Sequence, residues 1–164
     1  VIAQGIHQAF HPGRTAQLRT QDGQTIGYAG ELHPKLLQTE NLPERTCAFE
    51  VNFTELFASR SGVPQASPIY GYPAATQDVA LVVDENIPAS EVAQALRDGA
   101  GELLEDLRVF DDYRGQGVES GKKSLAFAMR FRAPDRTLTA EEASASREAA
   151  VAVAAERFGA VARV

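Results

Sequence analysis

The sequence predicts an α+β protein in which a mixed segment of short elements precedes a small domain of order β, α, β, β, α, β. Three observations support this prediction. Residues 77–84 and 122–133 read as strands, because β-branched or alternating apolar residues are bounded by turn residues. Apolar residues at helical spacing follow each of these strands. Residues 59–73 hold three prolines and two glycines without hydrophobic periodicity, as a connecting segment does.

This composition shift divides the chain into three expected parts. They are a first module at residues 1–58, a linker at 59–69 and a second domain at 70–164. The chain also begins at Val1 without an initiator methionine, so we expect a fragment whose first module lacks its N-terminal part.

The first module is expected to contain short, mixed elements. Residues 17–20 and 25–29 flank an Asp22-Gly23 pair, which predicts a tight hairpin with both central residues at positive φ. The remaining expected elements are a helical turn at 34–39, an alternating strand at 46–53 and a short helix that Thr54 caps.

The second domain is expected to be more regular. After the strand at 77–84, a helix starts at Pro88, buries Val92, Ala95 and Leu96, and ends near two glycines. Strands at 107–113 and 122–133 come next. Thr139 and Glu142 have the spacing of a capping box, which predicts a long helix that Gly159 ends; on it, Val151, Ala154, Ala155 and Phe158 share a face. With a last strand at 160–164, this order is that of a ferredoxin-like fold with a four-stranded antiparallel sheet.

The strands of this domain have two chemically different faces. Every second residue of strand 122–133 is a large apolar one, and this face belongs beneath the helices: Leu125, Phe127, Met129 and Phe131. The opposite face carries Ser124, Ala126, Ala128, Arg130 and Arg132. The same alternation assigns Ala80 of the first strand, and Val109, Asp111 and Tyr113 of the second, to the open face.

Asp111, Tyr113 and Ser124 thus form a candidate site over an alanine floor. An aromatic ring stacks on an unpaired base, and a carboxylate accepts hydrogen bonds from the amino and imino edge of guanine. The structural alternative is that Tyr113 covers sheet surface and that Asp111 is an ordinary solvated acid.

The charge gives two opposite indications about nucleic acid. The whole chain has a net charge of −6, which argues against a nucleic-acid partner. Residues 114–136, however, hold six cations and two acids, so Lys122, Arg130 and Arg132 become candidate phosphate contacts. The alternative is a solvated strand edge that cations protect against aggregation.

Other classes of site find little support in the sequence. A single cysteine, Cys47, excludes a disulfide framework or a Cys-rich zinc site, and its alternating apolar strand predicts a packed thiol in a reducing compartment. His11 and His33 each precede a proline and are expected to fix turns rather than bind metal. No apolar run is long enough to cross a membrane.

The segment FDDYRGQGVESGKKSLAFAMRFRAPDRTLTAEE, residues 110–142, resembles the C-terminal anticodon-binding domain of bacterial phenylalanyl-tRNA synthetase beta subunits. In the first module, His11-Pro12-Gly13-Arg14 and Gly30-Glu31-Leu32-His33-Pro34 resemble the end of the same subunit's catalytic-like module. Essentially the whole chain is similar to the last part of that subunit.

The resemblance implies a cytoplasmic protein whose second domain has an RNA-recognition-like fold and binds the anticodon loop of phenylalanine tRNA during aminoacylation. Tyr113 would stack on the first anticodon base, a guanine, Asp111 would hydrogen-bond it, and Ser124 would lie nearby. The first module would be shaped like a class II synthetase core without catalytic residues, and would assemble with the alpha subunit in a heterotetramer of two alpha and two beta subunits. ATP and magnesium would belong to the alpha subunit, with no cofactor, metal or catalytic residue in this fragment. Thr76 and Gln77 stand where the family often has arginines.

Two other functions remain to be weighed. A small hydrolase of the acylphosphatase type has the same element order, but its phosphate loop would here be Asp84-Glu85-Asn86, which repels anions. A subunit-assembly module without direct RNA contact is the other alternative, and only the Asp111, Tyr113 and Ser124 face argues against it.

Overall fold

The computed structural model describes residues 1–59, 66 and 71–163. The chain divides into two compact units, Val1–Ala66 and Ser67–Val164, and each is described by itself. The linker expected at 59–69 lies mostly outside the described residues.

The first unit is built on an antiparallel sheet of order β1-β2-β3-β4. Its strands are β1 (Ile2–Gln4), β2 (Phe10–Arg19), β3 (Thr25–Leu32) and β4 (Cys47–Val51). Helix α1 (Pro34–Thr39) lies between β3 and β4, and helix α2 (Phe53–Ala58) follows β4.

Two local expectations for this unit need correction. The β2–β3 hairpin forms as predicted, but Gly23, with φ of 90°, has the left-handed backbone and Asp22 does not. The turn starts earlier, because the Gly23 amide donates to the Thr20 carbonyl (3.2 Å). Helix α2 is capped by Asn52 rather than Thr54, since the Asn52 side chain accepts from the Glu55 amide (3.3 Å).

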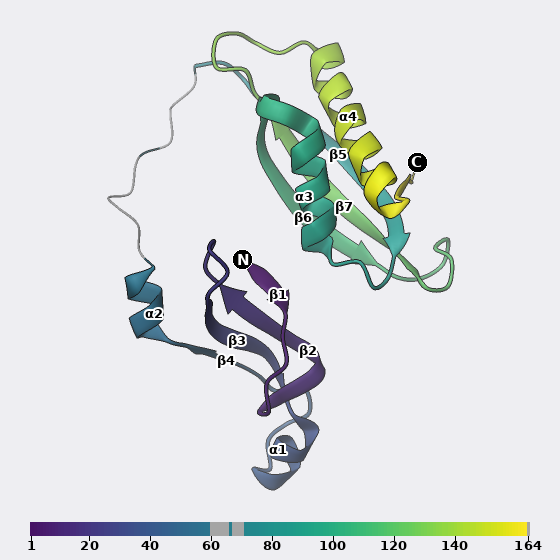
Figure 1. Ribbon diagram of the computed structural model, residues 1–164. Coiled ribbons are helices and arrows are strands. Elements are labelled where there is room, and N and C mark those ends of the chain that lie inside the picture. Colours follow the sequence, from purple (N-terminus) through teal and green to yellow (C-terminus); the bar gives the residue numbers. More distant parts are fainter. Residues whose placement is uncertain (60–65, 67–70, 164) are drawn as a thin grey trace. The chain divides into compact units, whose positions relative to one another are not determined.

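The second unit has the predicted element order. Its elements are β5 (Ala75–Asp84), α3 (Ala89–Ala100), a 3₁₀ turn (Gly101–Leu103), β6 (Leu104–Tyr113), β7 (Lys122–Phe131), α4 (Ala140–Phe158) and β8 (Val161–Ala162). The antiparallel sheet has the order β6-β7-β5-β8, and α3 and α4 lie together on one face of it (Figure 1). The α+β class and the ferredoxin-like order are therefore confirmed. Neither α3 nor α4, the two α-helices described in this unit, covers the opposite face of the sheet.

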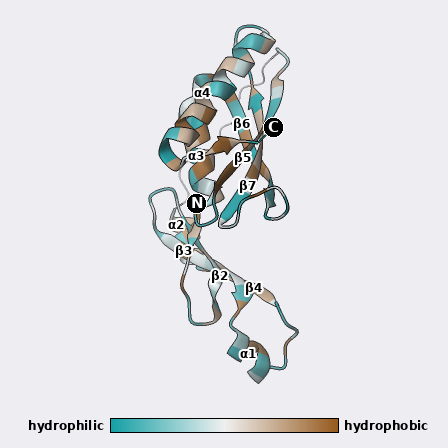
Figure 2. Cartoon of the chain, turned by 90° about the vertical axis from the view of Figure 1, so that its right-hand side faces the viewer, coloured by the Kyte–Doolittle hydropathy of each residue, from teal (hydrophilic) through white to brown (hydrophobic). Residues whose placement is uncertain are grey.

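The core lies between the sheet and the two helices, where apolar segments face one another (Figure 2). The four predicted inward residues of β7 are 0–1% exposed, and Val92, Ala95 and Leu96 of α3 are 0% exposed. Helix α4 contributes mainly alanines, namely Ala143, Ala150 and Ala154. Of the four apolar residues expected at helical spacing on α4, Ala154 is buried and Ala155 is exposed.

The predicted helix signals are present in the structure. Thr139 and Glu142 form a capping box at the start of α4, and Gly159, with φ of 61°, ends the helix. Gly99 marks the close approach of α3 to α4, because a Cβ there would lie 2.8 Å from the Ala149 carbonyl oxygen.

Strand β6 departs from simple alternation. A β-bulge falls between Val109, which pairs with Phe127, and Asp111, which pairs with Ala126. Cross-strand partners share a face, so Val109 lies on the helix side, and its assignment to the open face is wrong. Asp111 and Tyr113 lie on the open face as predicted.

Candidate nucleic-acid interface

The register of the second sheet brings the three singled-out residues together. Tyr113 of β6 lies opposite Ser124 of β7, and Asp111 lies opposite Ala126. Ala126 in turn lies opposite Ala80 of β5. These residues line an open, shallow depression of about 390 Å³. Its full lining is Ala80, Asp111, Tyr113, Ser124, Ala126 and Arg163.

The loop after β6 fixes the Tyr113 side chain. The Tyr113 hydroxyl donates to the Gln116 carbonyl (3.2 Å), and a Cβ at Gly115 would lie only 2.7 Å from the Tyr113 Oη. The side chain keeps 38% of its surface exposed, whereas Ser124 beside it is 5% exposed. The site therefore presents a positioned aromatic ring beside a floor of small residues.

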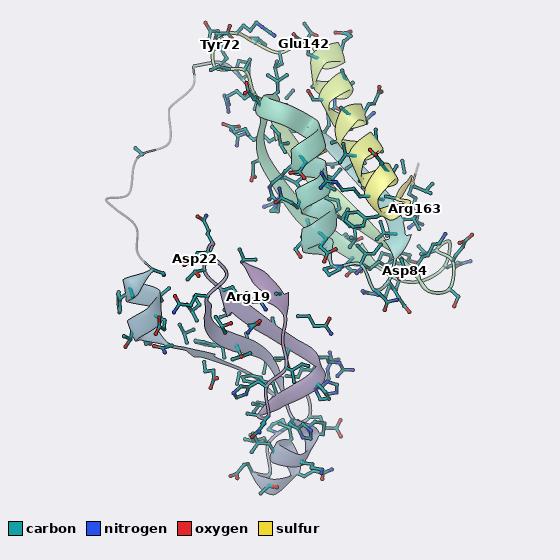
Figure 3. The ribbon with its side chains drawn as sticks, in the orientation of Figure 1. Arg19, Asp22, Tyr72, Asp84, Glu142 and Arg163 are labelled. Carbon is teal, nitrogen blue, oxygen red and sulfur yellow. The ribbon has the colours of Figure 1, made fainter. Side chains whose placement is uncertain are left out.

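Arg163 completes the depression from the far edge of the sheet. Its amide donates to the Ala80 carbonyl (2.8 Å), which extends the pairing of β8 with β5 by one residue. Its guanidinium Cζ lies 5.4 Å from the centre of the Tyr113 ring, a cation–π contact. Figure 3 shows Arg163 at the same end of the unit as Asp84. Sequence reasoning missed Arg163, because only the β8–β5 register brings the tail to this face.

The chemistry around the depression is complementary to a flat, polar ring. Tyr113 offers a stacking surface, and the small side chains of Ala80 and Ala126 leave room above the sheet. Asp111 supplies a hydrogen-bond acceptor, while Arg163 supplies a planar set of donors. A guanine has donors on one edge, which suit the Asp111 carboxylate, and two acceptors, O6 and N7, on another, which suit the Arg163 guanidinium.

The predicted cations at the other end of β7 are paired with one acid. Arg130 and Arg132 contact Glu105 of β6 at 2.6 and 2.9 Å, and Arg132 also donates to the Tyr72 carbonyl. Figure 3 shows Tyr72 at the opposite end of the unit from Arg163. Arg130 is six residues along the strand from Ser124, a span of roughly 20 Å. Arg130 and Arg132 are thus not part of the depression.

Lys122 and the remaining cations of residues 114–136 are also engaged. Lys122 pairs with Glu119 at 2.7 Å, and its ammonium group lowers the pKa of the Glu119 carboxyl. Arg114 pairs with Asp112, Arg136 pairs with Glu142, and Lys123 is buried. The positive balance of this stretch is reduced because Glu105, Asp112 and Glu142 lie outside it in sequence but contact it in space.

Thr76 and Gln77, which stand where the resembled family often has arginines, lie on different sides of the sheet. Thr76 is exposed and lies opposite Arg130. Gln77 lies opposite Met129 and donates to the Ser144 hydroxyl of α4 (3.0 Å), with its carbonyl oxygen buried and unpaired. Gln77 therefore lies under the helices, away from the candidate interface.

The histidines and the cysteine of the first unit have local surroundings. His11 Nδ1 accepts from the Gly13 amide (3.1 Å), and His33 Nδ1 accepts from the Lys35 amide (3.2 Å), so each fixes the backbone after it. Within the described residues, no three His, Cys, Asp or Glu side chains are grouped as metal ligands. Cys47 is exposed, so the prediction of a packed thiol is wrong.

Glu31 links two arginines beside a second depression of about 560 Å³ in the first unit. Arg14 and Arg45 contact its carboxylate at 2.6 and 3.3 Å and hold the Glu31 pKa below its usual value. These two ion pairs connect β3 with β2 and with the segment before β4. Among the helices that the structure describes, none has the length and apolar character needed to span a membrane.

Comparison with known proteins gives matches for both units. Residues 71–163 match the family described as ferredoxin-fold anticodon binding domain, and residues 1–53 match the phenylalanyl tRNA synthetase beta chain CLM domain. Phenylalanine–tRNA ligase beta subunits of Streptomyces avermitilis and Thermobifida fusca are 54% and 51% identical to the chain over 99% of its length. That of Leifsonia xyli is 52% identical over 98%. The chain spans about a fifth of the length of these relatives, 20%, 20% and 19% respectively.

Proposed function

Since the chain belongs, through residues 71–163, to the family of ferredoxin-fold anticodon binding domains, we propose that its second unit binds the anticodon loop of phenylalanine tRNA. The binding surface is the open face of the β6-β7-β5-β8 sheet. The single observation that supports this assignment is the depression in which Asp111, Tyr113 and Ser124 meet over alanines.

Each of these three side chains has a distinct role in the proposal. Tyr113 stacks on the first anticodon base, a guanine, because its ring is exposed and held by the Gln116 carbonyl. Asp111 accepts hydrogen bonds from the guanine N1 and N2 groups, which adenine does not offer in the same pattern. Ser124 supplies a small polar side chain next to the ring.

Lys122, Arg130 and Arg132 are proposed as weaker, sequence-independent contacts to phosphates. Each must exchange or share a carboxylate partner, Glu119 or Glu105, to bind RNA. Their contribution to affinity is therefore expected to be smaller than that of free surface cations, although it still weakens as salt increases.

The comparisons also support a proposal for the larger protein. We propose that the chain is part of a cytoplasmic phenylalanine–tRNA ligase beta subunit, with the first unit as a piece of its catalytic-like module. Phenylalanine activation, with ATP and magnesium, then belongs to the alpha subunit of a two-alpha, two-beta assembly. In this scheme the present chain supplies recognition of tRNA and no catalytic group.

The decisive experiment measures binding of the 164-residue chain to a phenylalanine tRNA anticodon stem-loop. Tyr113→Ala should weaken binding by about 1–3 kcal/mol, the value of one stacked base. Asp111→Asn should reduce the preference for guanine over adenine at the first anticodon position. Tyr72→Ala is the matched control, because Tyr72 is similarly exposed (41%) but lies at the other end of the unit. Parent-like binding and guanine preference in both site variants would exclude this site.

A subunit-assembly module without direct RNA contact is the second candidate. The pairing of Lys122, Arg130 and Arg132 with carboxylates favours it, because it reduces the attraction for phosphate. Binding of the stem-loop at two salt concentrations separates the two functions. Absence of binding at low salt supports assembly, whereas salt-dependent binding that Tyr113→Ala weakens supports anticodon recognition.

A further inference from the structure

Arg163 lies over one face of the ring that the proposed function assigns to the RNA, although Tyr113 keeps 38% of its surface exposed. Its guanidinium Cζ is 5.4 Å from the Tyr113 ring centre, and both side chains line the same depression. A base that stacks on this face of Tyr113 meets the guanidinium before it reaches the ring. Arg163 must therefore either leave the site or become part of it.

The separation of the two groups favours the second possibility. Atoms of stacked layers are in best contact at about 3.5 Å, so a base held between two planar groups sets them about 7 Å apart. The guanidinium Cζ already lies over the ring, 5.4 Å from its centre, so along the line that joins them it needs to withdraw by only about 1.6 Å to admit a base. Such a movement is small for a long side chain and requires no change of the sheet.

The surroundings of Arg163 permit this movement while they hold its backbone. The Arg163 amide is bound to the Ala80 carbonyl (2.8 Å), so the backbone stays at the edge of β5. On the loop side, Gly117 has φ of 86°, and a Cβ there would stand 3.3 Å from Arg163 Nη2. A side chain at this position would crowd the guanidinium, and glycine avoids that contact.

We propose that Arg163 and Tyr113 form a clamp, in which the guanidinium stacks on the face of the base that Tyr113 does not cover. This inference rests on the proposed function and adds a residue that specifies how the base is held. In the RNA-free protein the guanidinium occupies the place of the base and protects the ring. When the base enters, the cation–π contact with Tyr113 is replaced by stacking of the guanidinium on the base.

A simple phosphate contact is the competing explanation for an arginine at this place. The two explanations differ in what a lysine can replace, because lysine retains the charge but lacks the planar group that stacks. They also differ in the RNA feature that matters, since a clamp requires the base and a phosphate contact does not.

The test uses the 164-residue chain and two anticodon stem-loops, one with guanosine and one with an abasic nucleotide at the first anticodon position. The measured quantity is the ratio of the two affinities for the parent, Arg163→Lys, Arg163→Gln and Tyr113→Ala. The clamp predicts that Arg163→Lys lowers this ratio about three- to tenfold, with little change in affinity for the abasic RNA. Arg108→Lys, on the open face opposite Ala128 but outside the depression, is the control and should keep the parent ratio.

The remaining outcomes separate the clamp from the proposed function. An unchanged ratio in Arg163→Lys, with Arg163→Gln weaker toward both RNAs, overturns the clamp in favour of a phosphate contact. If Tyr113→Ala lowers the ratio and neither Arg163 variant does, the clamp alone is wrong. If Tyr113→Ala also keeps the parent ratio, the proposed anticodon site itself fails. Circular dichroism of each variant verifies that the second unit is folded.

Discussion

The two units have sheets of similar size but very different interiors. In the second unit, α3 and α4 enclose a continuous cluster of buried apolar residues against β5, β6 and β7. In the first unit, Phe10 is the one buried apolar residue larger than glycine among those the structure describes. Several of its large apolar side chains are instead exposed: Ile6 (86%), Phe49 (76%), Phe57 (68%) and Phe53 (65%).

This difference shows that strand pairing and core formation contribute separately to the stability of these units. Both sheets satisfy their backbone groups by hydrogen bonding, which contributes only about 0.5–1.5 kcal/mol net for each bond. Burial of a large apolar side chain contributes about 1.5–3 kcal/mol, and the second unit has far more of it. We therefore expect the second unit to be the more stable one and to hold the candidate interface rigid.

The largest expected effect comes from removing a central ring of the second unit. Phe127→Ala, at a side chain that is 0% exposed, should lower the free energy of unfolding of that unit by about 3–5 kcal/mol. The matched variant Phe49→Ala should change the first unit by less than about 0.5 kcal/mol. Denaturant titration followed by NMR signals of each unit measures both. A loss at Phe49 as large as that at Phe127 would contradict the contrast between the interiors.

A smaller effect is expected where the two helices of the second unit touch. Alanine normally stabilises a helix relative to glycine by about 1 kcal/mol. At Gly99, however, a Cβ would lie 2.8 Å from both the Ala149 carbonyl oxygen and the Ala150 Cα, which are backbone atoms. Gly99→Ala should therefore destabilise the second unit by about 1–3 kcal/mol. Gly71→Ala, with no atom within 4 Å of its Cβ, is the control in the same thermal unfolding experiment.

The start of α4 should make a more modest contribution. The Thr139 hydroxyl accepts from the Glu142 amide (3.2 Å), so Thr139→Ala should lower the stability of the second unit by about 1 kcal/mol. Thr137→Ala, two residues before the cap and exposed, should leave the denaturation midpoint unchanged. Equal effects of the two variants would show that the cap does not stabilise this unit.

The smallest expected effect is a pH dependence at the same helix start. Hydrogen bonds from the Arg136 guanidinium, which has the larger effect, and from the Thr139 amide hold the pKa of Glu142 below its ordinary value of 4.5. A lowered folded-state pKa means that this stabilisation is complete above pH 4.5 and is lost as the pH falls through the folded-state value. The melting temperature of the parent should thus fall more steeply with acidification below pH 4.5 than that of Glu142→Gln. Parallel curves for the two proteins would argue against this linkage.

Local patterns in the sequence predict much of this architecture. The element order follows from periodicity, and the alternation in β7 gives both its buried residues and the open face with Ser124. The capping box at Thr139 and the helix end at Gly159 are equally local signals. Each of these features depends only on residues close together in the sequence. This explains why their predictions are confirmed.

The features that sequence reasoning misses depend on contacts between distant segments. Arg163 reaches Tyr113 only because β8 pairs with β5, and the alternation of the tail does not define that register. Arg130 contacts Glu105 across the β6–β7 pair, and Glu105 lies outside the positively charged residues 114–136. Cys47 belongs to an apolar alternating strand, but it is exposed among the residues of the first unit that the structure describes, so the pattern does not lead to burial.

The β-bulge in β6 determines which changes of length the strand can tolerate. Leu107, Val109, Asp111 and Tyr113 are spaced by two, so an unbroken strand would direct all four to the same side. The extra residue, Phe110, shifts the alternation by one step, so the first two lie on the helix side and the last two on the open side. Deleting Phe110 would regularise the strand and keep both this division and the pairing of Tyr113 with Ser124. One additional residue there would keep the division in a regular strand only by moving Tyr113 past Ser124. Related chains are thus expected to differ in length at this point by loss of a residue more readily than by gain.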